Sequence, residues 1–311
     1  MAQRAKKSKS AKPSPSKPPA NHFVKSSSFT VVGIGASAGG LEAFAALLGA
    51  LPANPGAAFV LIQHLDPKHE SMLTEILSRA TTMPVMEAKE GTKVKVDHVY
   101  VIPPNANLAI ERKTLRVKPR TFTRGQHMPV DIFLRALAED QKNKAIGVIL
   151  SGTASDGVLG MKAIKAEGGI TFAQEEKSAK HPGMPHSAVA AGVVDFILSP
   201  EEIASEIQRF LHHPYVTSLK AVSTGDTLPK SRSNLTKIYD MLRNAFRTDF
   251  SGYKDTTIRR RIKRRMILHR MDEPEVYVRY LRDHPEEVEA LYHDILINVT
   301  SFLRDPGTFR P

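Results

Sequence analysis

The chain has 311 residues, 41% of them hydrophobic, which is enough for one large domain and a smaller one. It contains no cysteine, which excludes disulfides, thiolate nucleophiles and cysteine-based zinc sites, and no metal site is predicted. The formal net charge is +12, no apolar run approaches the roughly 20 residues of a membrane helix, and no secretory signal begins the chain, so we expect a cytoplasmic protein.

Residues 1–28 are predicted to form a disordered basic tail. They consist mainly of Lys, Ser, Pro and Ala, and no acidic residue precedes Glu42. Such a composition offers too little apolar surface to offset the entropic cost of ordering the chain. A second basic cluster lies at residues 259–265, so nucleic acid is one partner to consider, and a solvated tail with one basic helix is the simpler interpretation.

Residues 29–214 alternate apolar β-type runs with helical patterns. The runs include "FTVVGIG", "AAFVLIQ", "KAIGVILSG" and "GITFAQ". Strands that are apolar on successive residues are buried on both faces, which predicts an α/β domain with a doubly wound, mainly parallel sheet. Between residues 83 and 119, "HVYVIPPNANLAIERKTLRVKP" predicts a β-hairpin inserted in this sheet.

The second half of the chain is predicted to hold a polar linker, residues 215–232, and a small all-α domain, residues 233–311. The linker lacks clear periodicity, whereas "LTKIYDMLRNAF" and "DTTIRRRIKRRMILHRM" are typical of helices. In the second of these, Ile258, Ile262 and Met266 recur every four residues and should pack against the other helices.

The loop "GIGASAGG" fits two chemistries. Gly33 and Gly35 followed by small residues are typical of a dinucleotide phosphate loop, and Gly35 to Gly39 also read G-x-S-x-G, a nucleophile elbow around Ser37. The first interpretation requires an acidic residue at the end of the second strand to hold the ribose. That strand ends at His64, so the expected acid is missing.

Three candidate catalytic side chains follow three different strands. Ser37 follows the first strand, His64 the second, and Asp156 a later one. Because the carboxyl ends of parallel strands meet at one edge of a sheet, a nucleophile, its base and an orienting acid would lie together there. The chain order Ser, His, Asp differs from that of α/β-hydrolases. The alternative to a catalytic role is that His64 is a strand-end histidine without a function and that Asp156 is the N-cap of the helix that follows it.

Five segments of the α/β region resemble a known family. The segments "GIGASAGG", "LIQHLDP", "HVYVIPP", "GVILSGTASDGVLGM" and "GMPHSAV" are similar to the catalytic domain of chemotaxis protein-glutamate methylesterases, the CheB family. The resemblance covers residues 29–213. It implies a doubly wound fold with Ser37 as nucleophile, His64 as base and Asp156 as orienting acid, and no cofactor.

The activity that the resemblance implies is hydrolysis of glutamyl methyl esters on chemotaxis receptors, with deamidation of glutamine as a variant. Backbone N–H groups near Ala38 and in the loop from Thr153 to Asp156 are expected to form the oxyanion hole. The family often has Met at the position of Thr153. Members also usually carry an N-terminal receiver domain, which is not expected in this chain because fewer than 30 residues precede the first strand.

The helical segment is similar to the N-terminal domain of chemotaxis receptor methyltransferases, the CheR family. The resemblance rests on "DFSGYKDTTIRRRIKRRM" and "ILINVTSFLRDPGTF". It implies groups near S-adenosylmethionine at Asn298, Thr300 and Arg304. No Gly-rich cofactor loop follows, so the methyltransferase core is expected to be missing and the chain to be the first part of a fusion of the two enzymes.

The resemblance also implies that the basic helix faces a receptor. The predicted docking residues are Arg259, Arg260, Arg261, Lys263, Arg264 and Arg265. Alternatively, acidic residues of "DEPEVYVRYLRDHPEEVEA" neutralise them within the domain. No aromatic residues interleave with the arginines to stack on bases, which argues against nucleic acid as the partner. The competing hypothesis for the whole chain is a regulatory protein that binds nucleotide through the Gly-rich loop and nucleic acid through the basic helix.

Overall fold

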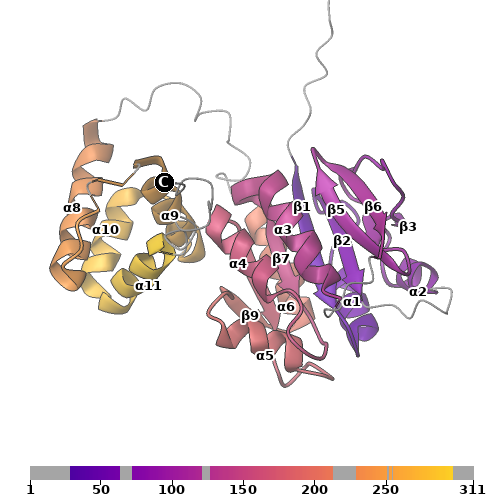
Figure 1. Ribbon diagram of the computed structural model, residues 1–311. Coiled ribbons are helices and arrows are strands. Elements are labelled where there is room, and N and C mark those ends of the chain that lie inside the picture. The colour runs from indigo at the N-terminus through magenta and orange to yellow at the C-terminus, as the bar shows by residue number, and fades with distance from the viewer. Residues whose placement is uncertain are drawn as a thin grey trace, which may run out of the picture.

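The computed structural model describes most of the chain in six ranges: residues 29–63, 72–120, 127–212, 229–250, 252–253 and 255–296. We refer to residues 29–212 as the α/β part and to residues 229–296 as the helical part (Figure 1). Several predicted features lie outside these ranges: the basic tail, His64, most of the linker, Asn298, Thr300 and Arg304. Within the described ranges, every helix is too short or too polar to cross a lipid bilayer.

The α/β part is built on a seven-stranded sheet in which every pairing is parallel. The strand order is β3-β4-β2-β1-β7-β8-β9. The strands are β1 (Thr30–Ala36), β2 (Ala57–Gln63), β3 (Val85–Glu87), β4 (Val99–Val101), β7 (Ile146–Ile149), β8 (Ile170–Gln174) and β9 (Phe196–Leu198). The central strands are buried along most of their length, as their continuous apolar runs predict, so the predicted fold class is confirmed.

Helices cover both faces of the sheet (Figure 1). On one face pack α1 (Gly40–Gly49), α2 (Leu73–Ala80) and α6 (Pro200–His212). On the other face pack α3 (Pro129–Gln141), α4 (Val158–Glu167) and α5 (Gly183–Ala190). Each layer buries its own apolar cluster, so the sheet is shielded from water except at its edges and strand ends.

A separate two-stranded hairpin is formed by β5 (Ala106–Glu111) and β6 (Thr114–Pro119). The hairpin prediction is therefore correct for these residues. It is wrong for "HVYV", because Val99–Val101 is β4 and pairs in parallel with β2 inside the main sheet. The pattern of a short apolar run does not show its pairing partner, and only tertiary packing decides that β4 joins the main sheet while β5 and β6 do not.

Helix α3 was not predicted from the sequence. Its close packing against β1 explains why glycine stands at positions 33 and 35. Both glycines lie inside β1, facing α3. A Cβ added to Gly35 would lie 2.2 Å from a methyl group of Val130, and one added to Gly33 would lie 2.7 Å from Leu134. The glycines therefore let α3 approach the strand closely. They do not form a phosphate-binding loop, so the dinucleotide interpretation is wrong.

The helical part consists of α8 (Pro229–Phe246), α9 (Asp255–Leu268), α10 (Pro274–Asp283) and α11 (Pro285–Leu296). Helix α8 begins inside the segment that the sequence assigns to the linker. The predicted apolar stripe of Ile258, Ile262 and Met266 is buried in the core of this part, as expected from its spacing.

A buried polar network joins three of these helices around Glu287, whose exposure is only 3%. Its carboxylate accepts hydrogen bonds from Nε of Arg265 (2.8 Å) and from the hydroxyl of Tyr277 (2.7 Å), and Nε2 of His269 lies 2.7 Å away. Burial alone would raise the pKa of Glu287, but the hydrogen bonds from Arg265 and His269 outweigh it and hold the pKa at about 2.

This network predicts an acid-sensitive helical part. A carboxyl group whose pKa is about 2 in the folded state and 4.5 in the reference state stabilises the fold above pH 4.5 and loses that contribution as the pH falls toward 2. We expect Glu287→Gln to lower the free energy of unfolding by roughly 2–3 kcal/mol at pH 6, and by much less near pH 2. Urea unfolding of both chains at several pH values measures this difference.

The matched control is Glu289→Gln, because Glu289 lies on the same helix with a side chain that is 63% exposed. Its effect should stay within about 0.5 kcal/mol at every pH. A stability difference for Glu287→Gln that does not change with pH would contradict the assignment.

Candidate active site

Ser37 lies at the point of the sheet where the strand order reverses. It follows β1, whose neighbours are β2 on one side and β7 on the other, and Ala36 pairs with Gln63 while Gly35 pairs with Ile149. Ligands of doubly wound sheets bind in the crevice at such a switch point. Gln63 directly precedes His64, which lies outside the described residues, and the Gln63 side-chain amide donates to the Ser37 carbonyl at 3.5 Å.

The chain turns sharply at Ser37 and enters α1. The Ser37 N–H donates to the carbonyl of Ser151 (3.0 Å), and the Gly40 N–H donates back to the Ser37 carbonyl (2.9 Å). Gly39 has φ 71°, and a Cβ placed there would lie 2.7 Å from the Ser151 hydroxyl oxygen. A glycine is therefore required both by the left-handed backbone and by lack of space, as expected for a nucleophile elbow.

Ser151 fastens this elbow to two neighbouring loops, and the sequence analysis missed it. Its hydroxyl donates to the Ala38 carbonyl (2.8 Å) and accepts from the His181 N–H (3.0 Å). Its own N–H donates to Oε1 of Gln174 (2.8 Å). Ser151 and Gln174 follow or end buried strands, so polar residues at the carboxyl ends of apolar runs are the signal that could have indicated them.

Asp156 is 2% exposed and caps a helix other than its own. Its two carboxylate oxygens accept the N–H groups of Val130 (3.0 Å) and Asp131 (2.9 Å) in the first turn of α3. Helix α4 begins at Val158 with Gly157 as its N-cap. The alternative interpretation of Asp156 as the N-cap of its own helix is therefore wrong, and the carboxylate is held at the same sheet edge as Ser37.

Asp131 is a second buried carboxylate beside Asp156, and no sequence motif singled it out. Burial raises the pKa of Asp131, the nearby charge of Asp156 adds to this, and N–H groups of Gly160, Leu159 and Gly157 oppose it. A sequence signal for Asp131 does exist. Pro129 is typical of the first position of a helix, and an acidic residue is favoured in the first turn.

The predicted oxyanion-hole donors lie in two loops of this edge. Ala38 is half-buried and follows the serine, and Thr153 is exposed in the loop after β7. Among the described residues, neither backbone N–H has an acceptor. The oxyanion role of these two N–H groups stays a prediction.

The two most buried basic residues of α9, Arg261 and Arg264, face the α/β part, so these two are not exposed for the predicted receptor docking. Arg264 is 1% exposed: its guanidinium pairs with Asp195 of the α/β part and with Asp294 of α11, and its Nε donates to the Gly169 carbonyl at 2.9 Å. Arg261 is fully buried and donates to the carbonyls of Lys165 and Ala166 at the end of α4.

Two further arginines of this cluster also have intramolecular partners. The guanidinium of Arg260 lies 3.3 Å from a carboxylate oxygen of Glu167, and Arg265 pairs with Glu287 in the buried network. Lys165 adds a second cation within 3.7 Å of both Asp195 and Asp294. Figure 1 shows α9 as the helix of the helical part that lies next to α4. Acidic residues inside the helical part thus neutralise some of the charge, as the alternative interpretation expected, and acidic residues of the α/β part neutralise the rest.

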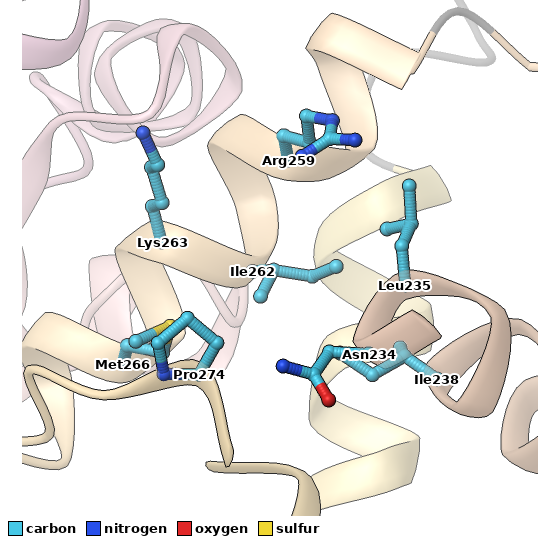
Figure 2. A pocket seen from close by; sticks show the side chains of 8 residues that line it. All are labelled: Asn234, Leu235, Ile238, Arg259, Ile262, Lys263, Met266 and Pro274. Atoms are coloured by element: carbon cyan, nitrogen blue, oxygen red, sulfur yellow. The ribbon is translucent and has the colours of Figure 1, made fainter. Parts of the chain in front are cut away.

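Arg259 and Lys263 are partly exposed and border a cavity of about 70 Å³ between α8 and α9. In Figure 2, Ile262 points from α9 toward Leu235 and Asn234 of α8, and Lys263 points away from them. Sites for drug-sized ligands and cofactors have volumes of roughly 300–1,000 Å³. This cavity is smaller than such sites, and Asn298, Thr300 and Arg304 lie outside the described residues.

Comparison with known families decides what this arrangement is. Residues 32–207 match the model of the CheB methylesterase family, which is more than half of the chain. The chain belongs to the CheB methylesterase family. Residues 233–296 match the all-alpha domain of CheR methyltransferases, so this CheB family member also carries CheR-type helices.

Solved and curated relatives agree with this assignment. The crystal structure of the Thermotoga maritima CheB methylesterase catalytic domain superposes with a TM-score of 0.55 at 29% identity, covering 59% of this chain and 99% of that one. A protein-glutamate methylesterase/protein-glutamine glutaminase 2 of Burkholderia lata is 37% identical over 179 residues, which are 57% of this chain and 53% of that protein.

A third relative matches a longer share of this CheB family member. An uncharacterised 104.1 kDa protein of Rhodobacter capsulatus is 32% identical over 255 residues, which are 76% of this chain and 27% of that protein. The chain thus spans about a quarter of the Rhodobacter protein and about half of the Burkholderia protein.

Proposed function

We propose that the chain hydrolyses methyl esters of glutamate side chains on methyl-accepting chemotaxis receptors, as a cytoplasmic enzyme. The observation that carries the proposal is the placement of Ser37 and Asp156 after β1 and β7, at the switch point of a CheB-type sheet. The relatives named protein-glutamate methylesterase support the substrate class. Their second name, protein-glutamine glutaminase, supports deamidation of glutamine as a further activity.

In the proposed mechanism, the Ser37 hydroxyl attacks the ester carbonyl of the methylated side chain, and His64 accepts the hydroxyl proton. The bond to the methoxy group breaks, His64 returns the proton, and methanol leaves an acyl-enzyme. Water activated by His64 then releases the glutamate carboxylate and regenerates the serine. With a glutamine side chain, the leaving group is ammonia.

The surrounding residues have supporting roles in this mechanism. Asp156, fixed by two N–H groups of α3, orients the histidine. The N–H groups of Ala38 and Thr153 donate to the oxyanion of the tetrahedral intermediate. Of the basic residues on α9, the partly exposed Arg259 and Lys263 are candidates for contact with an acidic receptor helix.

The division of the chain that we propose follows the sequence: a tail of residues 1–28, a methylesterase domain of residues 29–214, a linker of residues 215–232 and a CheR-type helical domain from residue 233. S-adenosylmethionine would concern only the helical domain and Asn298, Thr300 and Arg304. Because these three residues lie outside the described ranges, we derive no methyl-transfer step.

The test is methanol release from a methylated receptor fragment by the purified chain, followed over time beside a reaction without enzyme. Ammonia release from the unmodified receptor measures the glutaminase reaction in parallel. Methanol release well above the uncatalysed rate supports the proposal, and a folded chain that releases none from several methylated receptors overturns it.

A further inference from the structure

Two buried aspartates cap each other's helices at the active-site edge. Asp156, two residues before α4, accepts two N–H groups from the first turn of α3. Asp131, in the first turn of α3, accepts the N–H of Gly160 in the first turn of α4 at 2.8 Å. Each helix start therefore depends on a carboxylate from the other helix, and the N-cap residues Met128 and Gly157 supply no side-chain cap of their own.

The two helices have little freedom to move independently at this crossing. A Cβ added to Gly160 would lie 2.4 Å from Cβ of Leu134, so the two backbones approach closely. Asp131 is 5% exposed, so an N–H that lost this acceptor could not be hydrated without opening the crossing. The position of the first turn of α4, and with it the backbone of Asp156, thus depends on the Asp131 carboxylate.

We propose that Asp131 is a positioning residue of the esterase, which holds Asp156 in its catalytic position through the shared helix starts of α3 and α4. The inference rests on the proposed function. Asp131 is 5% exposed, and the hydrogen bonds of its N–H and carboxylate join it to Asp156 and Gly160, so we assign its effect to Asp156. Its removal shifts the orienting carboxylate by a fraction of an ångström to an ångström, a displacement that costs an enzyme roughly 10- to 100-fold in rate.

The experiment compares Asp131→Ala, Asp131→Asn and the wild-type chain in the methanol assay, well below the unfolding temperature of each. We expect Asp131→Ala to lower kcat roughly 10- to 100-fold while KM stays within about twofold, because a buried residue does not contact the receptor. Asp131→Asn keeps an oxygen that accepts the Gly160 N–H, so it should recover most of the lost kcat.

A matched control separates positioning from stability. Ile164→Ala removes a fully buried side chain from the other half of α4 and destabilises the chain by about 2–5 kcal/mol. It should leave kcat within about twofold of the wild type. Should Asp131→Ala fail to fold, Asp131→Ser serves instead, since its shorter side chain keeps a polar group but withdraws the oxygen from Gly160, and the same loss of kcat is expected.

Each outcome distinguishes the two hypotheses. A wild-type chain without esterase activity contradicts the proposed function itself. An active wild type together with a folded Asp131→Ala chain of unchanged kcat contradicts the positioning role alone. Equal losses of kcat in Asp131→Ala and Ile164→Ala, or an Asp131→Asn chain as slow as Asp131→Ala, would also overturn it.

Discussion

Replacement of Ser37 by alanine is expected to lower methanol release roughly 10⁴- to 10⁶-fold, because nucleophile and base act as a unit and the remaining groups cannot form an acyl-enzyme. The fold should survive. The turn is held by the Ser37 N–H and carbonyl, which alanine retains, and by the Ser151 hydroxyl, which the substitution does not touch. Initial rates with the methylated receptor fragment measure the loss.

A second readout for Ser37→Ala is covalent labelling by a fluorophosphonate, which requires an activated serine. The wild-type chain should be labelled at Ser37 and the variant should not. Ser205→Ala is the control, because this serine is exposed on α6, with its hydroxyl donating to the Glu201 carbonyl, and it should keep full activity. A Ser37→Ala chain that retains more than about 1% of the wild-type rate would show that another residue is the nucleophile.

The largest expected effect on stability comes from Arg264. Its guanidinium pairs with Asp195 and Asp294, whose side chains are 2% and 3% exposed. Attraction to Arg264 and Lys165 holds the pKa of Asp195 below its usual value in spite of a burial that would raise it. After Arg264→Ala, the remaining ion pair of each buried carboxylate among the described residues is with Lys165, whose Nζ lies 3.7 Å from an oxygen of each. Breaking a buried pair from one side costs about 3–5 kcal/mol.

Urea unfolding followed by circular dichroism tests this expectation, and Arg270→Ala is its matched control. Arg270 also pairs across to the α/β part, with Glu206, but its side chain is 68% exposed, so its loss should cost less than about 1 kcal/mol. A double-mutant cycle with Asp195→Asn should give a coupling energy of roughly 0.5–3 kcal/mol. An Arg264→Ala chain as stable as Arg270→Ala would show that the buried pairs do not hold the two parts together.

The same geometry changes how receptor-binding experiments on α9 are read. Arg264 and Arg261 are buried in the contact between the helical part and the α/β part. A charge reversal at either residue therefore disrupts this contact and does not change an exposed surface. Weaker receptor binding by such a variant would report damage to this contact. Substitutions at the partly exposed Arg259 and Lys263 address receptor contact directly.

The sequence by itself determined the sheet and the family, and it predicted the serine as nucleophile. Continuous apolar runs such as "AAFVLIQ" predict strands buried on both faces, and the serine, histidine and aspartate that follow such runs are assigned to one sheet edge. The strand predictions succeed because burial periodicity is a local property of the chain, readable within a window of about ten residues. The roles of the serine, histidine and aspartate stay predictions.

Only the tertiary structure decided how the charged residues are used. Arg264 and Asp195 are 69 residues apart in sequence, and Asp131 and Asp156 are 25 apart. A run of arginines on a helix reads as a solvated or partner-binding face, because nothing local shows that a second part of the chain covers it. Likewise, an aspartate before one helix does not reveal that it caps another. Ion pairs and caps of this kind depend on which elements pack together, and the sequence pattern of each element alone does not contain that information.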